Sequence, residues 1–142
     1  MKNILIFLLM CSSLYSNSFQ QNENYIIDKQ HNLIWQDTTD NINIRISHSK
    51  AIQYCKKLSL NGLVNWRLPS VKEYRYIIDK TRTDEIMINK SFRYILPTGY
   101  WTSDTTWRNF GRWGYYIFFK SGTAYYDNKT YKKFVRCVKD LK

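Results

Sequence analysis

Three cysteines and two histidines are the first side chains to consider as nucleophiles or metal ligands in this 142-residue chain. Cys55 and Cys137 lie far apart in the sequence, and the only histidines are His31 and His48. Two cysteines without neighbouring histidines make a poor zinc site, and a catalytic thiol has to be free. In a protein that leaves the cytosol, these two cysteines are instead expected to form a structural disulfide. We therefore predict neither a metal nor a cofactor.

Other catalytic arrangements have little support in the sequence. No serine lies in a nucleophile-elbow motif. Glu73 is accounted for by a helix cap, as described below, and Asp104 and Asp127 could form a carboxylate pair that nothing else marks as catalytic. We therefore predict that the chain is not an enzyme.

A basic, aromatic segment is the best candidate for a binding site. Residues 105–116 read T-T-W-R-N-F-G-R-W-G-Y-Y and lie between two predicted strands, where binding groups are common. Aromatic faces stack on sugar rings, and arginines bind sulfate, phosphate or carboxylate in two-point contacts. The alternative is that the segment is a hairpin whose aromatic side chains point alternately into the core, and we expect this position for Trp113. The candidate ligand-binding residues are Trp107, Arg108, Arg112 and Trp113.

The charge of the chain narrows the class of partner. The formal net charge is +11 at pH 7, which draws a protein toward anionic surfaces. An anionic glycan or another envelope component, such as lipopolysaccharide or phospholipid headgroups, is therefore expected as partner. The alternative is that the charge serves solubility alone. Nucleic acid would suit the charge and the aromatic residues, but the predicted export argues against it.

The N-terminus predicts export. Lys2 precedes an apolar run, Ile4–Met10, and small or polar residues follow, which is the pattern of a signal peptide of residues 1–18. Residues 19–142 would then form one domain in the periplasm or outside the cell, and any contact with a surface would be peripheral. A lipoprotein anchored through Cys11 is the rival interpretation, but Met10 is large for the position before such a cysteine. Nothing in the sequence predicts an oligomeric state.

The elements that must position these residues predict an α+β domain. Residues 25–28 and 33–37 read as a hairpin, and residues 42–46 as a further extended segment. One helix follows Ser47 or Ser49 and ends at Gly62; a second follows Pro69, with Ser70 and Glu73 as a capping box. Residues 81–99 read as a connection with one helical turn. Strands are expected at 100–103, 115–120, 123–126 and 134–138, so that both chain ends meet in one sheet.

Five segments in order resemble the Lcl C-terminal domain family. They are N-L-I-W-Q-D from Asn32, A-I-Q-Y-C from Ala51, N-W-R-L-P-S from Asn65 with Glu73, Y-W-T-S from Tyr100, and F-V-R-C-V from Phe134. The resemblance implies a single C-type lectin-like domain, with two helices packed on a mostly antiparallel sheet and one disulfide, Cys55–Cys137. The triplets of calcium-dependent sugar-binding lectins are missing, so lectin-type calcium binding is not expected. Structural roles are expected for the motif residues Trp35, Trp66, Arg67, Pro69, Glu73, Trp101 and Arg136.

Together these features predict an exported, non-catalytic domain that binds an anionic glycan or envelope polymer, with adhesion as a candidate role. The alternative is a structural or protein-interaction subunit of a bacterial envelope assembly, which predicts a stable oligomer or a co-purifying partner.

Overall fold

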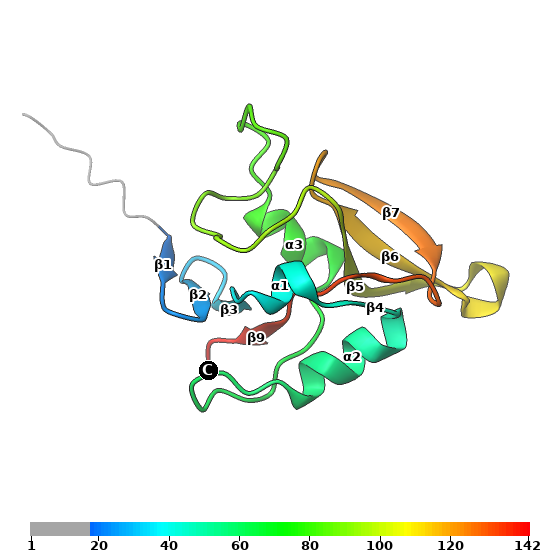
Figure 1. The fold of residues 1–142 in the computed structure, drawn as a ribbon, viewed down its shortest axis with the longest axis horizontal. Helices are drawn as coiled ribbons and strands as arrows, with labels where there is room; N and C mark the ends of the chain where they lie inside the picture. The colour runs from blue at the N-terminus through cyan, green and yellow to red at the C-terminus, as the bar shows by residue number, and fades with distance from the viewer. Residues whose placement is uncertain (1–17) are drawn as a thin grey trace, which may run out of the picture.

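The computed structural model describes residues 18–142, so the predicted signal peptide lies outside the described residues except for Ser18. The α+β class is confirmed, as is the single disulfide. The described part of the chain forms two mostly antiparallel sheets and three α-helices, with the first sheet on the left and the second on the right of Figure 1. The expectation of two helices on one sheet is therefore corrected.

The first sheet joins the two ends of the described chain. Its strand order is β1-β2-β3-β9, and all its pairs are antiparallel. The predicted hairpin is confirmed, and Asn32 adopts the left-handed conformation in its turn, with φ 55°. Trp35 pairs with Val138, so the last strand closes the sheet, as expected for chain ends that meet. The strands are β1 (Phe19–Gln21), β2 (Tyr25–Asp28), β3 (Leu33–Gln36) and β9 (Val138–Asp140).

The second sheet carries the candidate binding segment and has the order β4-β8-β5-β6-β7. The predicted strand 134–138 is wrong as one element, because the chain leaves this sheet after Phe134 and enters the other at Val138. The three residues between these two strands are all buried, as residues of a central strand would be. The sequence pattern therefore does not mark the point where the chain changes sheet. The strands are β4 (Arg45–Ile46), β5 (Gly99–Thr106), β6 (Trp113–Phe118), β7 (Thr123–Asn128) and β8 (Lys133–Phe134).

Two local expectations fail because tertiary contacts override the local pattern. The extended segment 42–46 begins as a short helix, α1 (Asp40–Asn43), because the buried Asn41 side chain bonds the backbone of Thr38 and Val135. Residues 81–99 contain no helical turn before β5 begins.

The first long helix is α2 (His48–Lys57), with Ser47 as N-cap and Leu58 as C-cap. It therefore ends before Gly62, contrary to the prediction. Gly62 has φ +78° and belongs to the tight turn between Leu60 and Leu63, whose backbone groups bond each other.

The second predicted helix, α3 (Val71–Ile77), begins with the expected capping box: Ser70 Oγ accepts from Glu73 N–H, and the Glu73 carboxylate accepts from Ser70 N–H. Arg67 donates two hydrogen bonds to the same carboxylate, at 2.9 and 2.7 Å, and a third to Asp140 at 3.0 Å. The Pro69 carbonyl accepts from a backbone N–H of β5, at Ser103. The start of α3 is thus tied to both sheets.

Substitution of Glu73 by Gln is expected to lower the free energy of unfolding by about 1 kcal/mol at pH 7, because the amide keeps the cap but loses the pair with Arg67. Burial alone would raise the pKa of Glu73, but hydrogen bonds from Arg67 and Ser70 and the Arg67 charge outweigh it, so the pKa is lowered. A lowered folded-state pKa gives stability that is present above the ordinary value and lost as pH falls through the folded value. The difference between wild type and variant should therefore shrink at acid pH.

The measurement is urea unfolding of both proteins at pH 7 and along an acid series. Glu85→Gln is the control, because Glu85 forms a salt bridge with Lys120 at 3.6 Å and is 75% exposed. A Glu73→Gln effect that stays constant from pH 7 into the acid range would contradict the proposed ion-pair origin.

The core joins both sheets through the motif tryptophans. Trp35 and Trp101 are fully buried and Trp66 is 2% exposed. Trp35 packs with Tyr74 of α3, whereas Trp66 and Trp101 belong to the cluster around the disulfide. The Cys55–Cys137 bond, with Cα atoms 5.5 Å apart, links α2 to the segment before β9.

Candidate binding site at the hairpin end

The tip of the β5–β6 hairpin, residues 107–112, projects at the right-hand end of Figure 1. Trp107 is 87% exposed and Phe110 is 95% exposed, and Arg108 and Arg112 are exposed beside them. Three of the four candidate ligand-binding residues therefore lie together on a projecting loop.

Lys129 ties this tip to the start of α2. Its backbone N–H donates to the Arg112 carbonyl at 2.9 Å, and its ammonium donates to the Gly111 carbonyl at 2.6 Å. Its own carbonyl accepts from His48 N–H at 3.0 Å. The tip, the turn after β7 and the start of α2 therefore form one end of the molecule (Figure 1), which we call the hairpin end.

A cavity of about 400 Å³ opens at the hairpin end, beside the start of α2. No acidic residue lines this cavity, which we call the basic cavity, and within residues 18–142 none of its cations forms a salt bridge. Arg45 Nε donates to the Lys132 carbonyl at 3.1 Å, which holds the two residues together across β4 and the turn before β8. The polar residues that line the cavity include Arg45, Ser47, Ser49, Lys50, Lys129 and Lys132.

His48 lies behind the basic cavity and adds no charge to it at neutral pH. Burial lowers the pKa of its imidazole; the hydrogen bond to Thr102 opposes this, and the Lys129 charge adds to it. Nε2 lies 2.8 Å from the Thr102 carbonyl, which can only accept, so Nε2 carries the proton of the neutral ring. The Arg and Lys side chains are therefore the positive groups of this end.

The basic cavity was not predicted as a unit. None of its four cations is among the predicted site residues, although Lys129 and Lys132 lie in a lysine-rich stretch, residues 129–133. The sequence signal that could have indicated this cavity is the pair of serines, Ser47 and Ser49, which lie between Arg45 and Lys50 at the start of a helix. The sequence alone does not say that residues 129–132 pack there, because the pairing of β4 with β8 places them.

Trp113, the fourth candidate, lies in strand β6 and is half-buried. Its ring stacks on Tyr126 of β7, with centroids 5.0 Å apart and planes 17° apart. It does not line the basic cavity.

The two carboxylates considered as a catalytic pair are both engaged: Asp104 accepts from Val71 N–H at 2.7 Å and Asp127 pairs with Lys133 at 2.8 Å.

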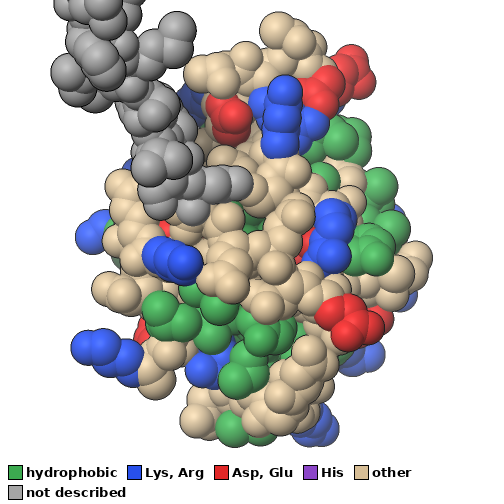
Figure 2. Space-filling view, turned by 90° about the vertical axis from the view of Figure 1, so that its left-hand side faces the viewer, with side chains coloured by type: hydrophobic (Ala, Val, Ile, Leu, Met, Phe, Trp, Pro, Cys, Tyr) green, Lys and Arg blue, Asp and Glu red, His purple; other side chains and the backbone are tan. Residues whose placement is uncertain are grey.

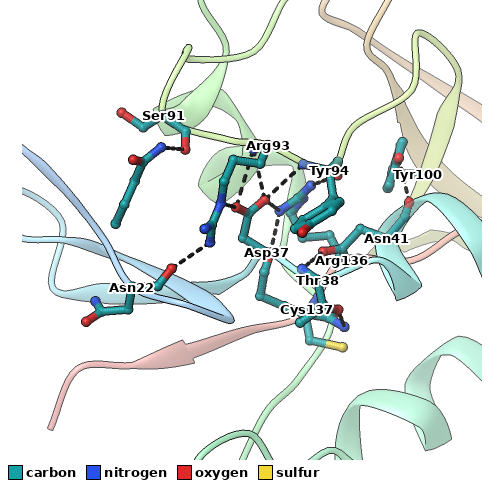
Figure 3. Close-up of polar contacts among 12 residues, drawn as sticks. Asn22, Asp37, Thr38, Asn41, Ser91, Arg93, Tyr94, Tyr100, Arg136 and Cys137 are labelled. Atoms are coloured by element: carbon teal, nitrogen blue, oxygen red, sulfur yellow. Dashed lines mark hydrogen bonds and ion pairs between the residues drawn. The ribbon is translucent and has the colours of Figure 1, made fainter.

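Arg136 belongs to a buried ion-pair cluster rather than to an open site. Figure 3 shows the Arg93 and Arg136 side chains pointing toward the Asp37 carboxylate from different segments of the chain. Arg93 Nε and Arg136 Nη1 lie 2.8 and 3.3 Å from Asp37 oxygens, and the Asp37 and Arg136 side chains are both 0% exposed. These pairs join the residue after β3 to the segment before β5 and to the segment before β9, so the cluster holds the fold together.

The opposite end of the molecule differs in charge from the hairpin end. On the face with β1 and β2, Figure 2 shows acidic as well as basic side chains, and a group of hydrophobic side chains in its lower half. The mixed charge of that face contrasts with the hairpin end, where no acidic residue lines the basic cavity.

Residues 18–142 contain neither a clustered set of metal-binding side chains nor a membrane-spanning helix. No group of three or more His, Cys, Asp and Glu side chains is placed to hold a metal ion. Nor is any helix in this part of the chain long and apolar enough to cross a membrane.

A family model matches most of the chain. The family model described as the Lcl C-terminal domain matches residues 24–139, which include both sheets from β2 onward and both sides of the disulfide. No curated protein matches the chain.

Proposed function

The chain belongs to the Lcl C-terminal domain family, and on that premise we propose that it is an exported, non-catalytic domain that binds an anionic glycan or envelope polymer at its hairpin end. One observation carries the proposal: the basic cavity gathers four cations from two segments of the chain, residues 45–50 and 129–132, without a carboxylate to neutralise them.

The arrangement suits a polymer with repeated negative charges better than a small neutral ligand. Lys133, the next residue along the chain, is paired with Asp127 and lies over the Tyr116 ring, 3.9 Å from its centroid. By contrast, none of the cations that line the basic cavity forms a salt bridge within residues 18–142, so their charge is available to an anionic ligand. Arg108 and Arg112 extend the positive surface onto the tip, so sulfate or carboxylate groups along one chain could contact both parts.

The test is retention on immobilised heparin, used as a model anionic glycan, over a salt gradient. Arg45→Ala with Lys132→Ala should weaken affinity by about tenfold or more, since a hydrogen bond to a charged group is worth about 1.5–3 kcal/mol. Arg108→Ala with Arg112→Ala should lower the eluting salt concentration as well.

Lys56→Ala with Lys57→Ala is the matched control, because it removes the same charge from two exposed residues in the last turn of α2. If the control elutes as early as the cavity variant, retention reflects net charge alone and the proposed site is wrong. Retention of the wild type that does not respond to salt would also exclude it.

A further inference from the structure

The tip of the β5–β6 hairpin presents hydrophobic surface that the basic cavity does not explain. Trp107 and Phe110 are the most exposed large hydrophobic side chains of the described residues, and neither lines the basic cavity. Exposure of such side chains to water is unfavourable, and grouped apolar surface commonly marks a site of contact.

The backbone of the tip holds these side chains outward at a cost. Asn109, Phe110 and Gly111 follow one another in the left-handed region, with φ of 52°, 55° and 71°. That region is unfavourable for a bulky residue such as Phe. Gly111 N–H donates to the Trp107 carbonyl at 3.2 Å, and the Lys129 ammonium donates to the Gly111 carbonyl, which fixes the turn. A conformation maintained against its intrinsic preference is typical of functional segments.

The charged side chains of the tip itself, Arg108 and Arg112, are both positive. The sequence contains no Asp or Glu from residue 105 to residue 126. Arg108 and Arg112 flank Phe110, and both are exposed. A projecting tip with aromatic residues at its apex and cations around them has the chemistry of an interfacial membrane contact, in which aromatic rings enter the headgroup region and cations bind lipid phosphates.

A sugar ring is a poorer fit to the same two side chains. Small-ligand and sugar subsites are concave and contain polar groups that orient the ligand. Phe110 offers no polar group and stands on a convex apex, 95% exposed.

We propose that the tip is a membrane-docking element: Trp107 and Phe110 insert into the interface of a bilayer that contains anionic phospholipid, while Arg108 and Arg112 bind its phosphates. This proposal goes beyond glycan binding and does not depend on the basic cavity.

The experiment measures binding to phosphatidylcholine vesicles with and without phosphatidylglycerol. Three of the five tryptophans, Trp35, Trp66 and Trp101, are buried, and Trp113 is stacked, so quenching by aqueous acrylamide reports mainly on Trp107. Vesicles with phosphatidylglycerol should protect Trp107 from acrylamide and shift its emission to shorter wavelength; phosphatidylcholine alone should do so much less.

Trp107→Ser with Phe110→Ser should weaken binding to the anionic vesicles by at least about tenfold, since burial of one large apolar side chain is already worth that factor. Val64→Ser is the control, because Val64 is also an exposed apolar residue, at 52%, and lies in the loop after α2. All variants keep the same N-terminal segment, so differences between them report on the tip.

Two results would overturn the proposal: Trp107 that stays open to acrylamide in vesicle-bound protein, or a double variant that binds vesicles as well as wild type. Heparin elution of the double variant separates the two proposed activities. If it elutes much earlier from heparin while vesicle binding is unchanged, the tip is a glycan contact. If heparin elution is unchanged and vesicle binding is lost, membrane docking stands by itself.

Discussion

Reduction of the Cys55–Cys137 disulfide is expected to lower the free energy of unfolding by about 4–5 kcal/mol. The bond joins residues 82 positions apart, and in the chain-entropy model a loop of this length restricts the unfolded chain by that amount. Domains of this size have total stabilities of about 5–15 kcal/mol. Reduced protein should therefore unfold at a much lower urea concentration, as measured by tryptophan fluorescence with and without dithiothreitol.

The double variant Cys55→Ala with Cys137→Ala is the control for this experiment. It should unfold near the midpoint of the reduced wild type and should not respond to dithiothreitol. Thiol titration of the wild type shows whether the bond was reduced. A midpoint that stays in place after complete reduction would mean that the packing of Trp66 and Trp101 around the two cysteines is enough by itself.

Features that depend on local sequence were predicted well. The hairpin 25–28 and 33–36 follows from alternating apolar residues around a short polar turn, and the α3 cap follows from Ser70 and Glu73 three residues apart. The disulfide follows from a count of cysteines together with the predicted export. In each case the physical cause lies within a few residues or within one residue type.

Features that depend on contacts between distant segments were not predictable in this way. The segment 135–137 passes from one sheet to the other, and its fully buried residues look like a continuous strand. Arg45 and Lys132 meet only because β4 pairs with β8. The candidate tip was predictable because its arginines and aromatics lie close together in the sequence, whereas the basic cavity is assembled from two separate segments, residues 45–50 and 129–132.

Substitution of Asp37 by Asn is expected to cost about 3–5 kcal/mol, although the side chain keeps its shape. The change leaves Arg136, with a side chain 0% exposed, without its buried counter-charge, and removal of one partner of a buried pair has this cost. The amide oxygen of Asn can still accept from the backbone N–H groups of Arg93 and Tyr94, but its NH2 group takes the place of Oδ2 and faces the Arg93 Nε–H donor. The measurement is urea unfolding of the variant against wild type.

Asp84→Asn is the matched control, because it makes the same chemical change in an Asp–Arg pair whose carboxylate is 54% exposed. Exposed pairs contribute little to stability, because solvent screens them, so this variant should stay near wild type. If both variants lose the same small amount of unfolding free energy, the buried pair contributes no more to stability than the exposed pair. Amide hydrogen exchange distinguishes the local cause from a general loss of stability. The Arg93 and Tyr94 amides exchange a charged acceptor for a weaker, neutral one in Asp37→Asn and should exchange faster, relative to global unfolding, than the amides of the β6–β7 pair.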